Sequence, residues 1–161
     1  MLKTNDLLEL RSMPLWPEIS LTLYKQFAQQ YLIPTVFRYH LKNNKILDVK
    51  FTEWSIYHLL GMQHIDGKIR NTDFFHKIDE GLDFGMFTEN RRTKKRFNDY
   101  KLRIRMFSCV YSIMCTADMF FVKSGQIEGK SVKADYLKHA LIDGKGVNIG
   151  IRNINGNYKR L

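Results

Sequence analysis

Two features of the sequence could support chemistry: a segment dense in positive charge and a histidine inside a short apolar motif. The basic segment, Arg91 to Arg105, holds eight positive charges against one acid, Asp99, and supplies seven of the chain's ten surplus charges. Such concentrated charge is typical of a surface that binds a polyanion, most commonly nucleic acid. The alternative is a solvated helix face, but such faces usually mix charges of both signs. The segment therefore predicts a polyanion-binding surface.

An apolar stripe runs through the basic segment and continues beyond it. Its members recur at steps of three and four, which is one face of an α-helix: Phe97, Tyr100, Ile104, Phe107, Tyr111 and Met114. We therefore expect a helix from about residue 89 to 119. Helical spacing places Arg92, Arg96 and Arg103 beside the stripe, whereas Lys101 and Arg105 point outward. The candidate nucleic-acid-binding residues are Arg38, Arg91, Arg92, Lys94, Lys95, Arg96, Lys101 and Arg105.

The histidine is His58, within Ile56-Tyr57-His58-Leu59-Leu60-Gly61. Its imidazole changes charge near neutral pH, so it suits proton transfer. A histidine inside a short apolar helix is also commonly a packing residue, because the neutral ring buries readily. Both interpretations stay open on the residues alone.

Other chemistries lack their motifs. Asp83-Phe84-Gly85 matches a kinase triplet, but no glycine-rich loop, strand lysine or catalytic loop accompanies it. The histidines never fall three or four apart and no cysteines stand at ligand spacing, so no metal site is expected. No nucleotide-binding glycine pattern occurs, and no cofactor is expected. Cys109 and Cys115 are interpreted as core residues in a reducing compartment.

Before the middle of the chain, the spacing of the apolar residues changes from the three or four positions of a helix to every second position. Residues 37–41 and 47–51 alternate apolar and polar side chains, which predicts a β-hairpin around residues 42–44. A three-residue loop keeps nearly all the apolar residues on one face, whereas a two-residue loop mixes the faces. That register pairs Arg38 with Asp48 on the polar face, beside His40.

Helices are expected on both sides of the hairpin. Pro17 at a first helical position predicts a helix to Tyr31, and Thr52 caps one over residues 53–62. Strands are expected at residues 120–123, 132–141, 147–153 and 157–161, the last after an Asn155-Gly156 turn.

This order predicts an α+β fold, in which N-terminal helices and a long central helix pack on a small antiparallel β-sheet. At 161 residues the chain has the size of one domain, residues 1–161. The N-terminal residues contain no signal-peptide core, and residues 106–122 continue the helical stripe, so they are interpreted as core helix rather than a membrane span. A cytoplasmic protein without membrane partners is expected.

Three of these features occur in the same order in a known group of proteins. An N-terminal helix, a basic hairpin and a hydrophobic-x-His-Leu-x-Gly helix, here Ile56 to Gly61, resemble the phage and mobile-element nucleases grouped as Barnase/EndoU/colicin/RelE-like. The strand Lys133-Ala134-Asp135-Tyr136-Leu137, after an Arg-bearing helix, is similar to one of the phage-encoded families. The resemblance covers roughly residues 20 to 155. The chain departs from it at Ile56, where an aromatic is usual, and at Leu60, where Thr is frequent.

The resemblance implies metal-independent cleavage of RNA. The 2′-hydroxyl attacks the adjacent phosphorus, which requires a base, cations around the charged transition state and an acid for the leaving 5′-oxygen. It implies His58 as base or acid, with Arg103 and Lys133 suited to clamping the phosphate. His40, beside Arg38 on the hairpin, is a further candidate.

The resemblance also leaves several partners open. The RNA could be a cellular transcript or a guide RNA, so the protein could be a toxin paired with an antitoxin or an anti-defence (anti-CRISPR) effector that acts on a ribonucleoprotein. The alternative is a non-catalytic module that binds nucleic acid and inhibits a nucleic-acid-loaded host defence complex. The sequence does not choose among them.

Overall fold

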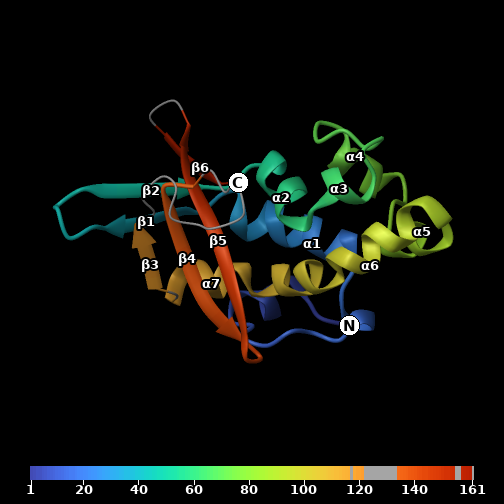
Figure 1. The fold of residues 1–161 in the computed structure, drawn as a ribbon, viewed down its shortest axis with the longest axis horizontal. Helices are drawn as coiled ribbons and strands as arrows, with labels where there is room; N and C mark the ends of the chain where they lie inside the picture. Colours follow the sequence, from blue (N-terminus) through green and yellow to red (C-terminus); the bar gives the residue numbers. More distant parts are fainter. Residues whose placement is uncertain (117, 122–133, 155–156, 161) are drawn as a thin grey trace.

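The computed structural model describes residues 1–116, 118–121, 134–154 and 157–160, and its fold is α+β, as predicted. The strands gather at one end of the molecule, and helices α3 (Met62–Ile65), α4 (Phe74–Asp79) and α5 (Phe84–Glu89) lie at the other (Figure 1). The long helical segment formed by α6 (Arg91–Met106) and α7 (Val110–Thr116) runs between the two ends. The hairpin of β4 (Tyr136–Ile142) and β5 (Lys145–Ile154) crosses it in this view (Figure 1).

The N-terminal part is helical but more broken than predicted. Two 3-10 turns, η1 (Thr4–Leu8) and η2 (Trp16–Glu18), precede α1 (Leu21–Phe27), and a π-helical turn, η3 (Ala28–Leu32), continues it. The predicted start at Pro17 is wrong. Pro17 lies inside η2, and α1 starts at the Ser20 cap, whose hydroxyl accepts a hydrogen bond from the backbone N–H of the third helical residue.

The predicted hairpin forms in the predicted register. Strands β1 (Val36–His40) and β2 (Ile46–Lys50) are antiparallel, with Arg38 opposite Asp48. Asn44 in the connecting loop has φ 59°, the left-handed conformation that asparagine tolerates better than most residues. The three-residue loop is therefore confirmed together with the apolar face it creates.

Four short helices follow the hairpin: α2 (Glu53–Leu60), α3 (Met62–Ile65), α4 (Phe74–Asp79) and α5 (Phe84–Glu89). Thr52 caps α2 as predicted, by accepting a hydrogen bond from the backbone N–H of Ser55. The predicted helix over residues 53–62 is divided at Gly61, whose positive φ of 76° ends α2 and lets α3 start in a new direction.

The long helix is present with one adjustment. It consists of α6 (Arg91–Met106), the 3-10 turn η4 (Phe107–Cys109) and α7 (Val110–Thr116). It ends before the predicted residue 119, because the chain has already entered strand β3 at Asp118. The apolar stripe faces the core as expected: four of its six members are buried and the two tyrosines are half-buried.

The remaining strands are β3 (Asp118–Phe121), β4 (Tyr136–Ile142), β5 (Lys145–Ile154) and β6 (Asn157–Arg160). The described strands form one sheet in the order β1-β2-β6-β5-β4-β3. Its pairs are antiparallel, as predicted, except that of β2 with β6, which is parallel. The predicted turn at residues 155–156 lies outside the described residues.

The core joins helices to sheet in one hydrophobic cluster. Tyr24 of α1 lies at its centre, where its hydroxyl lies 2.9 Å from the Ile104 carbonyl oxygen and 2.7 Å from Ser108 Oγ. Among the described residues, no helix combines the length and apolar character that crossing a bilayer requires.

Candidate functional site

A cleft of about 760 Å³ lies where α2, α3, the α6–α7 segment and β5 meet. This volume lies within the usual range of ligand-binding sites. It brings together two of the predicted site residues, His58 and Arg103. The lining residues are Trp54, His58, Leu59, Gln63, His64, Asp99, Leu102, Arg103, Met106, Phe107, Val110, Gly146, Val147, Asn148, Ile149, Gly150 and Arg152.

Helix α2 presents His58 to the cleft beside Trp54. The two residues are four apart, so they share a helix face, and their ring centroids lie 4.1 Å apart with a tilt of 50°. Tyr57 adds an edge-on contact at 5.3 Å. The imidazole is therefore half-buried between aromatic rings but still borders the cleft.

The surroundings of His58 hold its imidazole in the neutral form. Burial lowers the pKa of His58, and the positive charges of Arg103 and His64 lower it further. A neutral imidazole has a free lone pair at neutral pH, so His58 is prepared to accept a proton.

Arg103 lies against the C-terminal end of α2. Its Nε donates to the Leu59 carbonyl at 2.7 Å and its Nη2 donates to the His58 carbonyl at 2.6 Å. Carbonyls at a helix C-terminus lack the regular helical partners and carry partial negative charge, so a guanidinium stabilises them. Burial lowers the pKa of Arg103, yet an arginine stays charged at neutral pH. Its bonds to α2 leave the remaining N–H donors of the fork for a ligand.

The Gly61 turn positions a second histidine. A Cβ at Gly61 would lie 2.4 Å from Cδ1 of Tyr100, so only glycine lets the Tyr100 ring lie against this turn. The His64 ring stacks on the Tyr100 ring, with the two centroids 5.3 Å apart and the planes tilted by only 20°. His64 therefore lines the same cleft as His58.

Strand β5 forms the opposite wall. Asn148 and Arg152 both line the cleft, and Asn148 Oδ1 lies 2.7 Å from Nδ1 of His139 on β4. Gly150 also lines the cleft, and a Cβ at this position would lie 3.3 Å from the Cβ of Ala134.

Sequence reasoning missed His64, Asn148 and Arg152. His64 could be found only once Gly61 is known to reverse the chain, because six residues along one continuous helix do not bring side chains together. Asn148 and Arg152 alternate with buried isoleucines on a predicted strand. This alternation predicts that the two residues share the face of the strand opposite the isoleucines, but it does not predict that a cleft lies beside that face.

The predicted catalytic residue His40 lies elsewhere. His40 is on β1, opposite Ile46, and is not among the cleft residues. Its neighbour Arg38 donates from Nε and Nη2 to both carboxylate oxygens of Asp48 at 2.8 Å. This pair raises the pKa of Arg38 and lowers that of Asp48. Lys133 lies outside the described residues.

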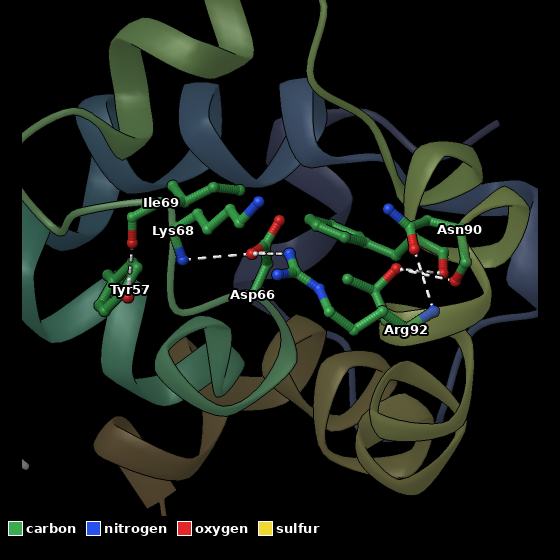
Figure 2. Close-up of polar contacts among 8 residues, drawn as sticks. Tyr57, Asp66, Lys68, Ile69, Asn90 and Arg92 are labelled. Atoms are coloured by element: carbon green, nitrogen blue, oxygen red, sulfur yellow. Dashed lines mark hydrogen bonds and ion pairs between the residues drawn. The ribbon is translucent and has the colours of Figure 1, made fainter.

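The basic segment is divided among several environments. Arg92 lies 3.1 Å from the Asp66 carboxylate, which also accepts a bond from the backbone N–H of Lys68 (Figure 2). This contact ties the start of α6 to the loop after α3. Figure 2 also shows the side chain of Asn90 accepting from the Arg92 backbone, which caps α6.

The outward placement predicted for Lys101 and Arg105 is wrong. Lys101 Nζ lies 5.7 Å from the Trp16 ring centroid, and Arg105 Nε donates to the Pro14 carbonyl at 2.9 Å. Both side chains are half-buried because the N-terminal segment folds back over this side of α6, which local periodicity does not reveal.

The remaining four cations of the basic segment are exposed: Arg91, Lys94, Lys95 and Arg96. Within the part of the chain that the structure describes, no salt bridge engages their side chains. These four form the exposed basic surface of α6.

The described residues contain no group of three or more His, Cys, Asp or Glu side chains arranged to hold a metal ion. The acid–base groups in the cleft are instead imidazoles and a carboxylate, Asp99, among cationic and amide side chains.

Comparison with known protein families identifies a family for this chain. The model of the family described as phage-Barnase-EndoU-ColicinE5/D-RelE like nuclease 4 matches residues 20–160. No curated protein and no solved structure matches the chain.

Proposed function

Because the chain belongs to the phage-Barnase-EndoU-ColicinE5/D-RelE like nuclease 4 family, we propose that its cleft cleaves RNA by metal-independent transesterification, with His58 as the base. The observation that carries the proposal is a neutral, half-buried imidazole beside a guanidinium in a cleft of nucleotide size.

The reaction uses a nucleophile that the substrate brings. His58 takes the proton of the 2′-hydroxyl, the 2′-oxygen forms a bond to the adjacent phosphorus, and the bond from phosphorus to the 5′-oxygen breaks. The leaving 5′-oxygen takes up a proton, so the products are a 2′,3′-cyclic phosphate and a 5′-hydroxyl. Negative charge grows on the phosphoryl oxygens in the transition state, where the cationic Arg103 and Arg152 stabilise it.

The exposed basic surface of α6 supports an RNA substrate longer than one nucleotide. Cations that contact phosphates add affinity that does not depend on sequence and weakens with salt. Cellular transcripts and guide RNA are both RNA substrates of this length. We therefore extend the proposal to a toxin or anti-defence role, in which the protein cleaves either kind of RNA.

Cleavage is tested with the purified chain in EDTA, using a single-stranded RNA and the DNA of the same sequence. The RNA is expected to yield 2′,3′-cyclic phosphate and 5′-hydroxyl ends, and the DNA to stay intact because it lacks the 2′-hydroxyl. His58→Gln should slow cleavage by about 10²–10⁴-fold with RNA binding kept.

His76→Gln is the matched control, because His76 is an exposed histidine on α4 that pairs with Glu80 and does not line the cleft. Its rate should equal that of the wild type. RNA that is bound but left intact by the wild-type protein would instead support the non-catalytic binding module.

A further inference from the structure

We propose that His64 is the general acid that protonates the leaving 5′-oxygen, while His58 is the base. This inference rests on the proposed function and adds a second catalytic residue to it. The geometry that points to it is the Gly61 turn, which folds α3 back so that both imidazoles border one cleft.

The reaction itself requires two proton-transfer groups in different places. The attacking and leaving oxygens lie roughly in line on opposite sides of the phosphorus. A base beside the 2′-oxygen therefore cannot also reach the 5′-oxygen in the same step. An acid from another element has to stand on the far side of the phosphate.

His64 is suited to that position. It comes from α3 rather than α2, and it is near enough to His58 for its charge to affect that imidazole. Stacking on Tyr100 at 5.3 Å fixes the plane of its ring, and Tyr100 is itself held against Gly61. His64 is exposed, so it can regain a proton from water after each turnover.

The other charged groups around the cleft are less suited to donate. Arg103 on α6 and Arg152 on β5 keep their protons at neutral pH because guanidinium is too weak an acid. Asp99 on α6, as a carboxylate, has no proton to give. His58 on α2 is already the base. Among the cleft residues, His64 is the group left for the acid.

The test separates acid catalysis from other roles by changing the leaving group. One substrate is a short RNA with a single scissile linkage, and the other is the same RNA with sulfur in place of the bridging 5′-oxygen. A thiolate leaves without being protonated, so it does not need the acid. With the full chain, His64→Gln should slow cleavage of the oxygen substrate by about 10²–10⁴-fold and leave the sulfur substrate within a few-fold of the wild type.

His58→Gln should slow both substrates, because both need the 2′-hydroxyl deprotonated, and His76→Gln should slow neither. Equal rates of the wild type and His64→Gln on the oxygen substrate would overturn the inference and keep the proposed function. Equal slowing of both substrates in His64→Gln would also overturn it, since His64 would then position or bind. Failure of the wild type on both substrates would overturn the proposed function and this inference with it.

Discussion

Gly61 meets two requirements that no residue with a Cβ satisfies at once. Its φ of 76° costs an L-residue about 1–2 kcal/mol, and a Cβ there would overlap the Tyr100 ring. Through Tyr100, the turn also fixes the ring on which His64 stacks. The glycine of the His-Leu-x-Gly motif therefore serves the site as well as the helix end.

Gly61→Ala is expected to reduce the free energy of unfolding by more than about 1 kcal/mol, because it adds both a strained φ and an overlap with Tyr100. Urea denaturation followed by circular dichroism measures the change. Gly67→Ala is the control, since its Cβ would meet only the Gln63 carbonyl oxygen at 3.9 Å, and it should stay within about 0.5 kcal/mol. Equal losses in the two variants would contradict the role given to Tyr100.

The His58 imidazole should titrate below its ordinary pKa of 6.5, because burial and two neighbouring positive charges disfavour its protonated form. The unfolded chain then takes up this proton at a higher pH than the folded chain. The contribution of His58 to stability is therefore lost as the pH falls from about 6.5 through the folded pKa.

Proton NMR of the imidazole as a function of pH measures this pKa directly. Arg103→Gln should raise it, because one of the two charges is removed. A His58 pKa at or above 6.5 in the wild type would contradict this account of the site.

At the scale of elements, α6 carries cations on two sides with different surroundings. Arg92, Arg96 and Arg103 recur on the side that faces α2 and the cleft. Lys94 and Lys101 recur on the other side, where the N-terminal segment covers the helix. An RNA that enters the cleft is expected to follow the first side.

Arg96→Gln should therefore weaken RNA binding and reduce the slope of log affinity against log salt by about 0.7, the value of one single-strand phosphate contact. Lys3→Gln removes the same charge from an exposed residue just before η1, outside the candidate RNA-binding residues, and should leave that slope unchanged. Fluorescence anisotropy over a salt series distinguishes them. Indistinguishable slopes for the two variants would mean that only the overall charge matters.

The elements themselves were predictable where a local pattern encodes them. The hairpin register followed from strict alternation, and the long helix followed from a stripe whose members are now seen to be buried or half-buried. The site was only partly predictable. His58 and Arg103 were predicted and line the cleft, but the placement of His64 depends on a turn at Gly61. Arg105 binds the carbonyl of Pro14, far away in sequence. Contacts between distant segments leave no periodic signal in either partner.

For the whole molecule, the aromatic residues that link the N-terminal segment to the helical end share one core. Phe97 is fully buried and its ring lies within 6.0 Å of Trp16, Phe84 and Phe87. These contacts join η2, α5 and α6. They favour unfolding of the chain as one unit.

Phe97→Ala should cost about 3–5 kcal/mol because it leaves a cavity among rings that are too rigid to close it. Calorimetry and urea denaturation are both expected to show a single transition at lower temperature and lower urea. Two resolved transitions, with the helical end melting first, would contradict the single domain that the chain length predicts.

The parallel pairing of β2 with β6 has a consequence for how the chain reaches this structure. Val49 pairs with Tyr158, so strand β6 lies between the β1–β2 hairpin, which comes early in the sequence, and strand β5, which comes late. Until residues 157–160 dock, β2 and β5 each present an open row of backbone donors and acceptors. Contacts so distant in sequence form slowly. During synthesis on a ribosome, β6 can therefore join β2 to β5 only after almost all of the described chain has emerged. Until then, the exposed edges of β2 and β5 are the segments that a chaperone would have to protect.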